Sequence, residues 1–204
     1  MPNNLVIDIS HHNGGPLDFV AAKNAGVVGV IAKATQGSGF KDPAYGARKT
    51  AAVNAGLLWG AYHFGTGANV DSQLSNFLGT TGIDNAMLYA LDFEANPGNT
   101  MSLAQARDFI QKLDTRLGRK AVIYGGDLLK TALGGTNDAF LGQHRLWWAQ
   151  YNTTANIPPT WSQFWLWQFS DGHHGPPPHA VNGIGPCDID NFDGTAAQLQ
   201  AQWA

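Results

Sequence analysis

The sequence predicts an α/β protein, a single irregular TIM-like (β/α) barrel of about eight strands that lacks some outer helices in its C-terminal part. Two observations predict this fold. Up to residue 135, short runs of apolar and β-branched residues alternate with stretches whose apolar residues have helical spacing. This alternation is typical of parallel strands covered by helices. Beyond residue 135, strand-like runs continue, but the helical spacing between them is lost.

Five strand–helix units are expected in the first part of the chain. The expected strands cover residues 5–10, 27–35, 57–65, 86–94 and 121–126. The expected helices cover residues 17–26, 42–56, 69–82, 102–118 and 127–135. The helix over 102–118 is the clearest, because Ser102 is a good N-cap and Gly118 a good C-terminal stop.

The C-terminal part is less regular. Strands are expected at 145–151, 164–170 and 187–192, followed by a closing helix at 195–203. The connection NTTANIPPTWSQ contains two prolines and no helical period, and HHGPPPHAVNGIGP is expected to be a loop. No linker divides the chain, so residues 1–204 are expected to form one domain.

Composition excludes several classes of function. Charged residues make up 13% of the chain and the net charge is −3. Lys and Arg are scattered, which argues against nucleic-acid binding, and no segment has the length and apolarity needed for membrane insertion. No long exposed apolar stripe is evident, so a monomer is expected. Cys187 is the single cysteine, so no intrachain disulfide can form.

The first residues, MPNNLVIDIS, lead directly into a strand and lack the basic start and apolar segment of a signal peptide. The protein is therefore expected to be made in the cytoplasm and released, as a phage or prophage endolysin is, or to be exported by a non-classical route. The polar residues at the ends of its expected strands indicate the substrate on which it acts, and therefore its place of action.

Polar side chains are concentrated where the expected strands end. In parallel barrels these ends form one rim, which carries the active site. The residues at these positions include Asp8, Lys33, Tyr62, Asp92, Glu94, Tyr124, Trp148, Gln168, Asp188 and Asp190. A single strand-end Asp is often a helix cap or a turn former. Convergence from nearly every strand instead favours a functional site.

The stretch LYALDFEAN places Asp92 and Glu94 two residues apart at the end of a strand, where both side chains should point the same way. Two neighbouring carboxylates in a half-buried cleft do not ionise independently, so one holds a proton while the other stays anionic. This pairing suits the cleavage of a glycosidic bond. Surrounding Trp and Tyr rings suit the stacking of sugars.

The motifs VIDISHHNG, AKATQG, GAYHFG, ALDFE, IYGG, LWWAQY, LWQFSDG and CDIDNFDG follow one another in an order and spacing that resembles glycoside hydrolase family 25, the Chalaropsis-type lysozymes or N-acetylmuramidases. The resemblance runs from about residue 4 to residue 194. It implies a modified barrel that hydrolyses the β-1,4 bond between N-acetylmuramic acid and N-acetylglucosamine in bacterial peptidoglycan, with retention of configuration.

The resemblance also implies roles for individual residues. Glu94 matches the general acid/base, and Asp92 its anionic partner, which either orients the substrate N-acetyl group in a substrate-assisted reaction or attacks carbon itself. Asp8 and Asp188 match two further acids of the site, at the ends of the first and last strands. The expected substrate-binding residues are Tyr62, Tyr124, Trp148, Gln168 and Lys33.

Two positions depart from the family pattern. Gln36 stands where the family often has Glu, so pH dependence or substrate affinity can differ here. Asp190 stands where Asn is frequent, and it is expected to add a negative charge near the rim. The histidines at 11, 12, 173, 174 and 179 have no convincing metal-ligand spacing, and the chemistry needs neither a metal nor a cofactor.

Two alternatives stay open from the sequence. A chitinase-like glycosidase would use the same D-x-E logic on chitin, and turnover of chitin oligosaccharides would separate it from a muramidase. A glycan-binding barrel without catalysis is the second alternative, and the intact pair of Asp92 and Glu94 argues against it.

Overall fold

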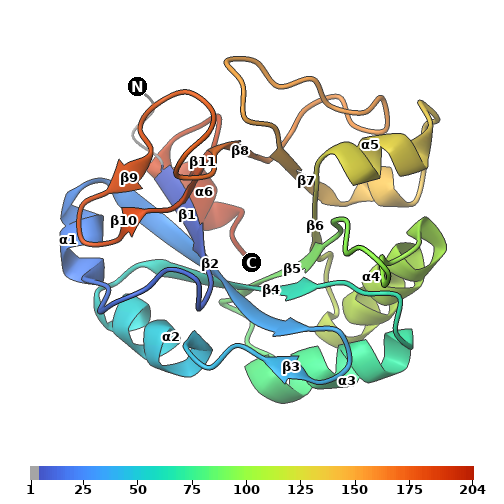
Figure 1. Ribbon diagram of the computed structural model, residues 1–204, viewed down its shortest axis with the longest axis horizontal. Helices are drawn as coiled ribbons and strands as arrows, with labels where there is room; N and C mark the ends of the chain where they lie inside the picture. The colour runs from blue at the N-terminus through green and yellow to red at the C-terminus, as the bar shows by residue number, and fades with distance from the viewer. Residues whose placement is uncertain (1–4) are drawn as a thin grey trace.

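The computed structural model describes residues 5–204, whose main feature is a closed barrel of eight strands (Figure 1). In barrel order these strands are β1 (Leu5–Ile9), β2 (Val27–Gln36), β4 (Leu58–Phe64), β5 (Leu88–Asp92), β6 (Val122–Gly125), β7 (Arg145–Ala149), β8 (Leu166–Ser170) and β11 (Asp188–Asn191). Neighbours from β1 to β8 are parallel, and the β1–β2 pairing together with β11 closes the ring. The predicted barrel is confirmed.

Five helices surround the barrel (Figure 1). They are α1 (Phe19–Asn24), α2 (Tyr45–Asn54), α3 (Val70–Thr81), α4 (Leu103–Leu117) and α5 (Asp127–Leu133). As predicted, Ser102 caps α4, where it forms a capping box with Gln105, and Gly118 ends the helix with a left-handed φ of 69°. No helix among residues 5–204 has both the length and the apolar character needed to span a bilayer.

The C-terminal half of the barrel has fewer covering elements, as predicted. A 3₁₀ turn, Leu141–Gln143, precedes β7, and residues 150–165 connect β7 to β8 without a helix. A small hairpin of β9 (Ala180–Val181) and β10 (Gly185–Pro186) follows β8. A further short strand, β3 (Phe40–Lys41), pairs with the end of β2.

The last barrel strand runs against its neighbours, which differs from the expected parallel order. β11 is antiparallel to both β1 and β8. A parallel strand would need a crossover that returns the chain to the opposite end of the barrel. The connection 171–187 instead contains only the small hairpin, so β11 starts at the rim where β8 ended. Asp188 therefore begins its strand, and the expectation that it ends the strand is wrong.

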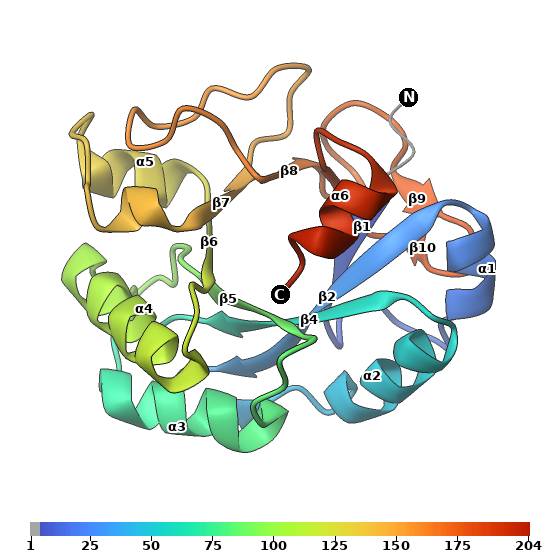
Figure 2. The same ribbon diagram turned by 180° about the vertical axis from the view of Figure 1, so that it is seen from behind.

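Apolar residues form two layers. The outer layer lies between the strands and the surrounding helices and includes Phe77, Phe109 and Trp148. The inner layer fills the barrel. In Figure 2, helix α6 (Ala196–Ala201) is seen beside β1, and the chain after it leads to a C-terminus drawn near the centre of the ring of strands. There Trp203, which is 1% exposed, packs within the interior cluster.

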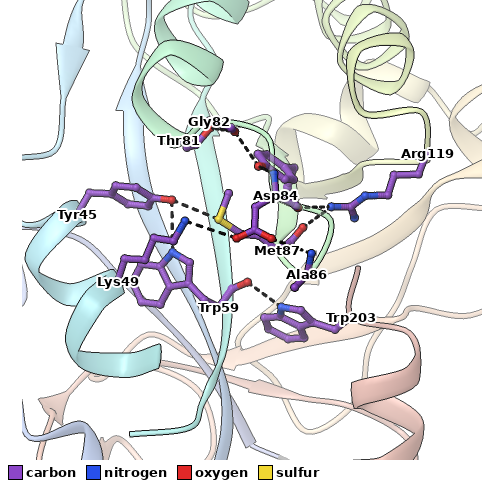
Figure 3. A network of polar contacts seen from close by, with 11 residues as sticks. Tyr45, Lys49, Trp59, Thr81, Gly82, Asp84, Ala86, Met87, Arg119 and Trp203 are labelled. Atoms are coloured by element: carbon purple, nitrogen blue, oxygen red, sulfur yellow. Dashed lines mark hydrogen bonds and ion pairs between the residues drawn. The ribbon is translucent and has the colours of Figure 1, made fainter. Parts of the chain in front are cut away.

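A network of polar contacts joins Trp203, just after α6, to the end of the barrel where the parallel strands begin (Figure 3). Trp203 donates its indole N–H to the carbonyl of Trp59 at 2.8 Å, and Trp59 donates its own to the Tyr45 hydroxyl at 3.3 Å. The large Trp203 ring lies against Gly29, where even a Cβ atom would be 2.6 Å from the indole. This end of the barrel is thus closed, which leaves the other end for a site.

Candidate active site

A cavity of about 310 Å³ opens at the rim where the parallel strands end. Its lining residues are Asp8, Ser10, His12, Lys33, Tyr62, Phe64, Asp92, Glu94, Tyr124, Trp147, Tyr151, Gln168 and Asp188. Eight of the nine site residues predicted from the sequence are among them, and Trp148 is the exception. The structure therefore brings together side chains from strands that are far apart in the chain.

The D-x-E pair reaches the cavity from the end of β5. Asp92, the last residue of β5, is 5% exposed, and Glu94 follows two residues later and is partly exposed. The chain between them stays aligned with β6, because the Phe93 N–H donates to the Tyr124 carbonyl at 3.0 Å. Phe93 packs in the outer core, whereas both acids line the cavity. The two carboxylates thus share one side, as the strand period requires.

The electrostatics of the pair depend mainly on burial. Burial, followed by the negative charge of Glu94, raises the pKa of Asp92 well above its ordinary value. Its Oδ1 atom is buried and has no hydrogen-bond partner among the described residues. The environment thus shifts Asp92 toward its protonated form, and the role of Asp92 as the anionic partner stays a prediction. Glu94 is the only glutamate of the 204-residue chain, and it lies in this cavity.

Gln168 links side chains in the cavity wall that come from β1, β6 and the segment after β7. Its amide nitrogen donates to Asp8 Oδ2 at 2.6 Å, and its amide oxygen accepts hydrogen bonds from the hydroxyls of Tyr124 at 2.8 Å and Tyr151 at 3.0 Å. Burial and then the charge of Asp188 raise the pKa of Asp8 well above its ordinary value. This network holds one acid and two hydroxyls at defined positions around the site.

The two acids of β11 lie at different depths. Asp188 lines the cavity, and burial followed by the charges of Asp171 and Glu94 raises its pKa to about 7. Asp190 is 0% exposed and accepts the indole N–H of Trp147 at 2.6 Å. Burial raises the pKa of Asp190 well above its ordinary value. The expectation that Asp190 adds a charge near the rim is therefore wrong, because β11 runs from the rim into the barrel and places Asp190 inside it.

The aromatic wall of the cavity is formed by Trp147 and not by Trp148. Trp148 is 1% exposed and packs in the outer core, whereas Trp147 lines the cavity. The register explains the difference, since Trp147 pairs with Tyr124, which faces inwards. The two rings meet edge to face with their centres 4.5 Å apart, and Tyr62 lies 6.3 Å from Trp147 on another side.

Sequence reasoning missed several lining residues. These are Ser10, His12, Phe64, Trp147 and Tyr151. Ser10 directly follows β1, Phe64 ends β4, and His12 and Tyr151 lie two or three residues beyond a strand, so the sequence places these four near the rim but does not distinguish them as site residues. The choice between the adjacent Trp147 and Trp148 is different, because it requires knowing which side chains of β7 face into the barrel.

Comparison with known families decides the assignment. The family model described as "Glycosyl hydrolases family 25" matches residues 7–176, which is most of the chain. The protein belongs to glycosyl hydrolases family 25. The matched segment includes the D-x-E pair, Gln168 and the strands that carry them. Asp188 lies beyond it and is contributed by the antiparallel strand.

Relatives of this family 25 protein extend over nearly its whole length. Lysozyme M1 of Streptomyces globisporus is 32% identical over 215 residues, which cover 96% of this chain and 69% of that protein. The N,O-diacetylmuramidase of a Chalaropsis species is 26% identical, with 91% of this chain and 95% of that protein covered. The crystal structure of a bacterial lysozyme from Streptomyces coelicolor superimposes with a TM-score of 0.84 at 30% identity, covering 98% and 96% of the two chains.

A second hollow of about 500 Å³ adjoins the family 25 cavity on the side of β6 and β7. The two share Glu94, Tyr124 and Tyr151, and the second extends to Asp127 and Gln150. Glu94 therefore lines both hollows. Such a groove can hold a polymer on both sides of a bond that reaches Glu94.

Two of the histidines considered from the sequence make contacts in the loops beside the cavity. Among residues 5–204, no three His, Cys, Asp or Glu side chains are grouped so that they could hold a metal ion. His11 contacts the buried Asp42 at 2.9 Å, and His179 contacts the Ser170 hydroxyl at 3.1 Å. These contacts order the loops beside the cavity.

Proposed function

We propose that this protein is a muramidase, a lysozyme that hydrolyses the β-1,4 bond between N-acetylmuramic acid and N-acetylglucosamine in bacterial peptidoglycan. One observation carries the proposal: Asp92 and the chain's only glutamate, Glu94, line the same groove at the barrel rim. A pair of carboxylates beside a glycosidic bond is the arrangement that glycoside hydrolysis requires. Relatives named lysozyme and muramidase, which match 91–98% of this chain, support this substrate.

Glu94 is the proposed general acid and base. It is partly exposed and lines both adjoining hollows, so it can reach the oxygen between two sugars. In the first step Glu94 gives its proton to the leaving oxygen. In the second step it takes a proton from water, which attacks the sugar carbon from the side of the departed group. Two displacements at the same carbon give net retention.

Asp92 is proposed to act on the substrate acetamido group. Its unpartnered Oδ1 can accept the acetamido N–H, and a hydrogen bond to the charged form lowers the pKa of a carboxyl group. Lys33 acts in the same direction on the pKa of Asp92. Substrate binding would then transfer the pair's proton to Glu94 and leave Asp92 anionic. The acetamido oxygen, oriented by Asp92, would form the bond to carbon as the leaving group departs.

The test is lysis of purified bacterial cell walls by wild type and by Glu94→Gln. Removal of the proton donor should lower the rate at least about 10³-fold, within the range of general acid catalysis combined with charge stabilisation. Asp193→Asn is a matched control, because it removes one exposed carboxylate outside the groove. Wall lysis by Glu94→Gln at the rate of wild type would refute the assignment and favour a protein that only binds glycans.

A second assay separates a muramidase from a chitinase-like enzyme. Turnover of cell walls without turnover of chitin oligosaccharides is expected. Comparable rates on both would show that recognition rests on features that the two polymers share, and the preference for muramic acid would then be withdrawn.

The protein is proposed to act on the cell wall as a monomer. Its exposed large apolar side chains are scattered over several elements, as on ordinary monomers, and they are Val20, Phe40, Val53, Ile83 and Tyr151. Light scattering should give a mass near 21.8 kDa. Release as an endolysin or export by a non-classical route stays a prediction. Expression in bacteria with and without a pore-forming holin tests it, because an endolysin lyses the host only when the pore is present.

A further inference from the structure

Lys33 lines the cavity with a nearly buried positive charge. Its residue is 8% exposed, and it is the only Lys or Arg among the described residues that line the cavity. It lies on β2 opposite Tyr62 of β4, close to the side chains that end β4 and β5. The lining otherwise carries four carboxyl groups, Asp8, Asp92, Glu94 and Asp188.

The ammonium group has few partners in the protein. Its Nζ donates to Gln36 Oε1 at 2.7 Å and lies 4.8 Å from the centre of the Phe64 ring and 5.7 Å from that of Phe40. An ammonium group has three N–H donors, so two of them lack a protein acceptor among the described residues. The ion pairs found in residues 5–204 all involve other side chains.

A buried ammonium without an ion-pair partner is costly, because charge is poorly solvated inside a protein. Burial lowers the pKa of Lys33, while the negative charges of Asp92, Asp42 and Glu94 oppose this effect. Phe64 and Phe40 contribute a cation–π contact but no counter-charge. Because Gln36 is neutral, it fixes the position of the ammonium group and leaves its charge available.

We propose that Lys33 binds a carboxylate on the muramic acid side of the substrate, and that Gln36 keeps the ammonium group free for this contact. The proposal deepens the proposed function and rests on it. Muramic acid differs from glucosamine by a lactyl ether that ends in a carboxyl group. In the intact wall this group is linked to a stem peptide that carries carboxylates of its own. The free lactyl group and the stem peptide thus both offer a carboxylate, whereas a chitin chain has none.

The experiment compares kcat/KM on two forms of the same glycan. The first consists of muramyl glycan strands stripped of peptide, with free lactyl carboxylates, and the second of the same strands converted to neutral N-methylamides. Wild type should prefer the carboxylate form about tenfold, the equivalent of one charge-assisted contact of about 1.4 kcal/mol, and the preference should lie mainly in KM.

Two variants and a control isolate Lys33. In Lys33→Met, which keeps the length and apolar stem, the ratio of the two substrates should fall to about one. In Gln36→Glu the new carboxylate engages the ammonium group, so the ratio should fall as well, although Lys33 is still present. Lys41→Met removes an exposed lysine of the neighbouring β3, outside the cavity, and should keep the ratio of wild type. Circular dichroism checks that each variant folds.

The outcomes separate the possible roles. If Lys33→Met lowers kcat on both substrates and keeps their ratio, Lys33 acts on Asp92 and the proposal is overturned. If wild type shows no preference between the two stripped glycans, it is next assayed on strands with native stem peptides and on strands with amidated stem peptides. A preference for the native stem peptides assigns the stem carboxylate as the ligand of Lys33. No preference within either pair of substrates overturns the proposal. A wild type that cleaves no muramyl glycan refutes the proposed function instead.

Discussion

A neutral histidine behind the active site makes the stability of the fold depend on pH. His63 of β4 is 0% exposed and stacks on Phe109 with ring centres 4.9 Å apart. Its neighbours on the strand, Tyr62 and Phe64, line the cavity on the other face. His63 contacts the hydroxyl of Thr35 through Nδ1 at 2.7 Å, and Gln73 Oε1 through Nε2 at 3.2 Å.

The hydrogen bonds around His63 determine its tautomer. The amide nitrogen of Gln73 donates to the carbonyls of Thr66 and Ala68, so its Oε1 must be the acceptor toward the imidazole. Nε2 therefore carries the hydrogen, and Nδ1 accepts the hydroxyl of Thr35. A second proton on Nδ1 would break this pattern inside a buried site. Burial accordingly lowers the pKa of His63 from 6.5 to about 4.

The magnitude follows from proton linkage. The unfolded chain binds a proton at His63 as the pH falls through 6.5, whereas the folded protein binds it only near pH 4. The contribution to stability is therefore complete above pH 6.5 and is lost as the pH falls toward the folded pKa. At about 1.36 kcal/mol per pKa unit, the loss is about 2 kcal/mol at pH 5 and about 3 kcal/mol below pH 4.

The assay is urea unfolding of wild type and His63→Gln at pH 8 and pH 5. Other groups also titrate, and the acids with raised pKa values, such as Asp188, stabilise the fold at low pH and lose this effect as the pH rises. The comparison between the two proteins isolates His63. Wild type should lose about 2 kcal/mol more than the variant between the two pH values, whatever the variant costs at pH 8.

His173→Gln is the control, because it replaces an exposed histidine of the loop after β8. It should follow the pH dependence of wild type. If His63→Gln instead loses as much stability as wild type between pH 8 and pH 5, His63 is not held neutral by burial. The tautomer and the network derived above would then both be wrong.

The remaining predictions concern the cavity. Since burial and neighbouring charges raise the pKa of Asp188 to about 7, the pH profile of kcat/KM should contain a transition near pH 7 that Asp188→Asn abolishes; a profile left unaltered by this change would contradict it. Trp147→Phe should lower kcat/KM about tenfold and also destabilise the fold, because the buried Asp190 loses its indole donor, whereas Trp148→Phe should lower the free energy of unfolding by about 1–3 kcal/mol with little change in kcat/KM; a loss of kcat/KM in Trp148→Phe and not in Trp147→Phe would show that the faces are misassigned. Asp190→Asn keeps an acceptor for Trp147, so it should unfold near the temperature of wild type at pH 3, below the ordinary Asp pKa of 3.8, and at a higher temperature than wild type at pH 9; equal unfolding temperatures at both pH values would refute a raised pKa for Asp190.

Much of the architecture is local information and could be predicted from the sequence. Ser102 and Gly118 define α4 by a capping box and a left-handed stop, which need no tertiary contact. The period of two places Asp92 and Glu94 on one face of a strand, and strand ends of a parallel barrel converge on one rim. These local and topological rules were enough to assemble eight of the nine predicted residues around one cavity.

What the sequence by itself determined is the set of strands, the helices and the chemistry of the rim. Only the tertiary structure decided the direction of β11, and with it the burial of Asp190, because a connection without a helix gives no sequence signal for which way the next strand runs. It also decided between Trp147 and Trp148, since two identical neighbours carry no hydrophobic pattern and only pairing with Tyr124 orients them. The raised pKa of Asp92 likewise depends on burial, which is a property of the closed barrel and not of the D-x-E motif.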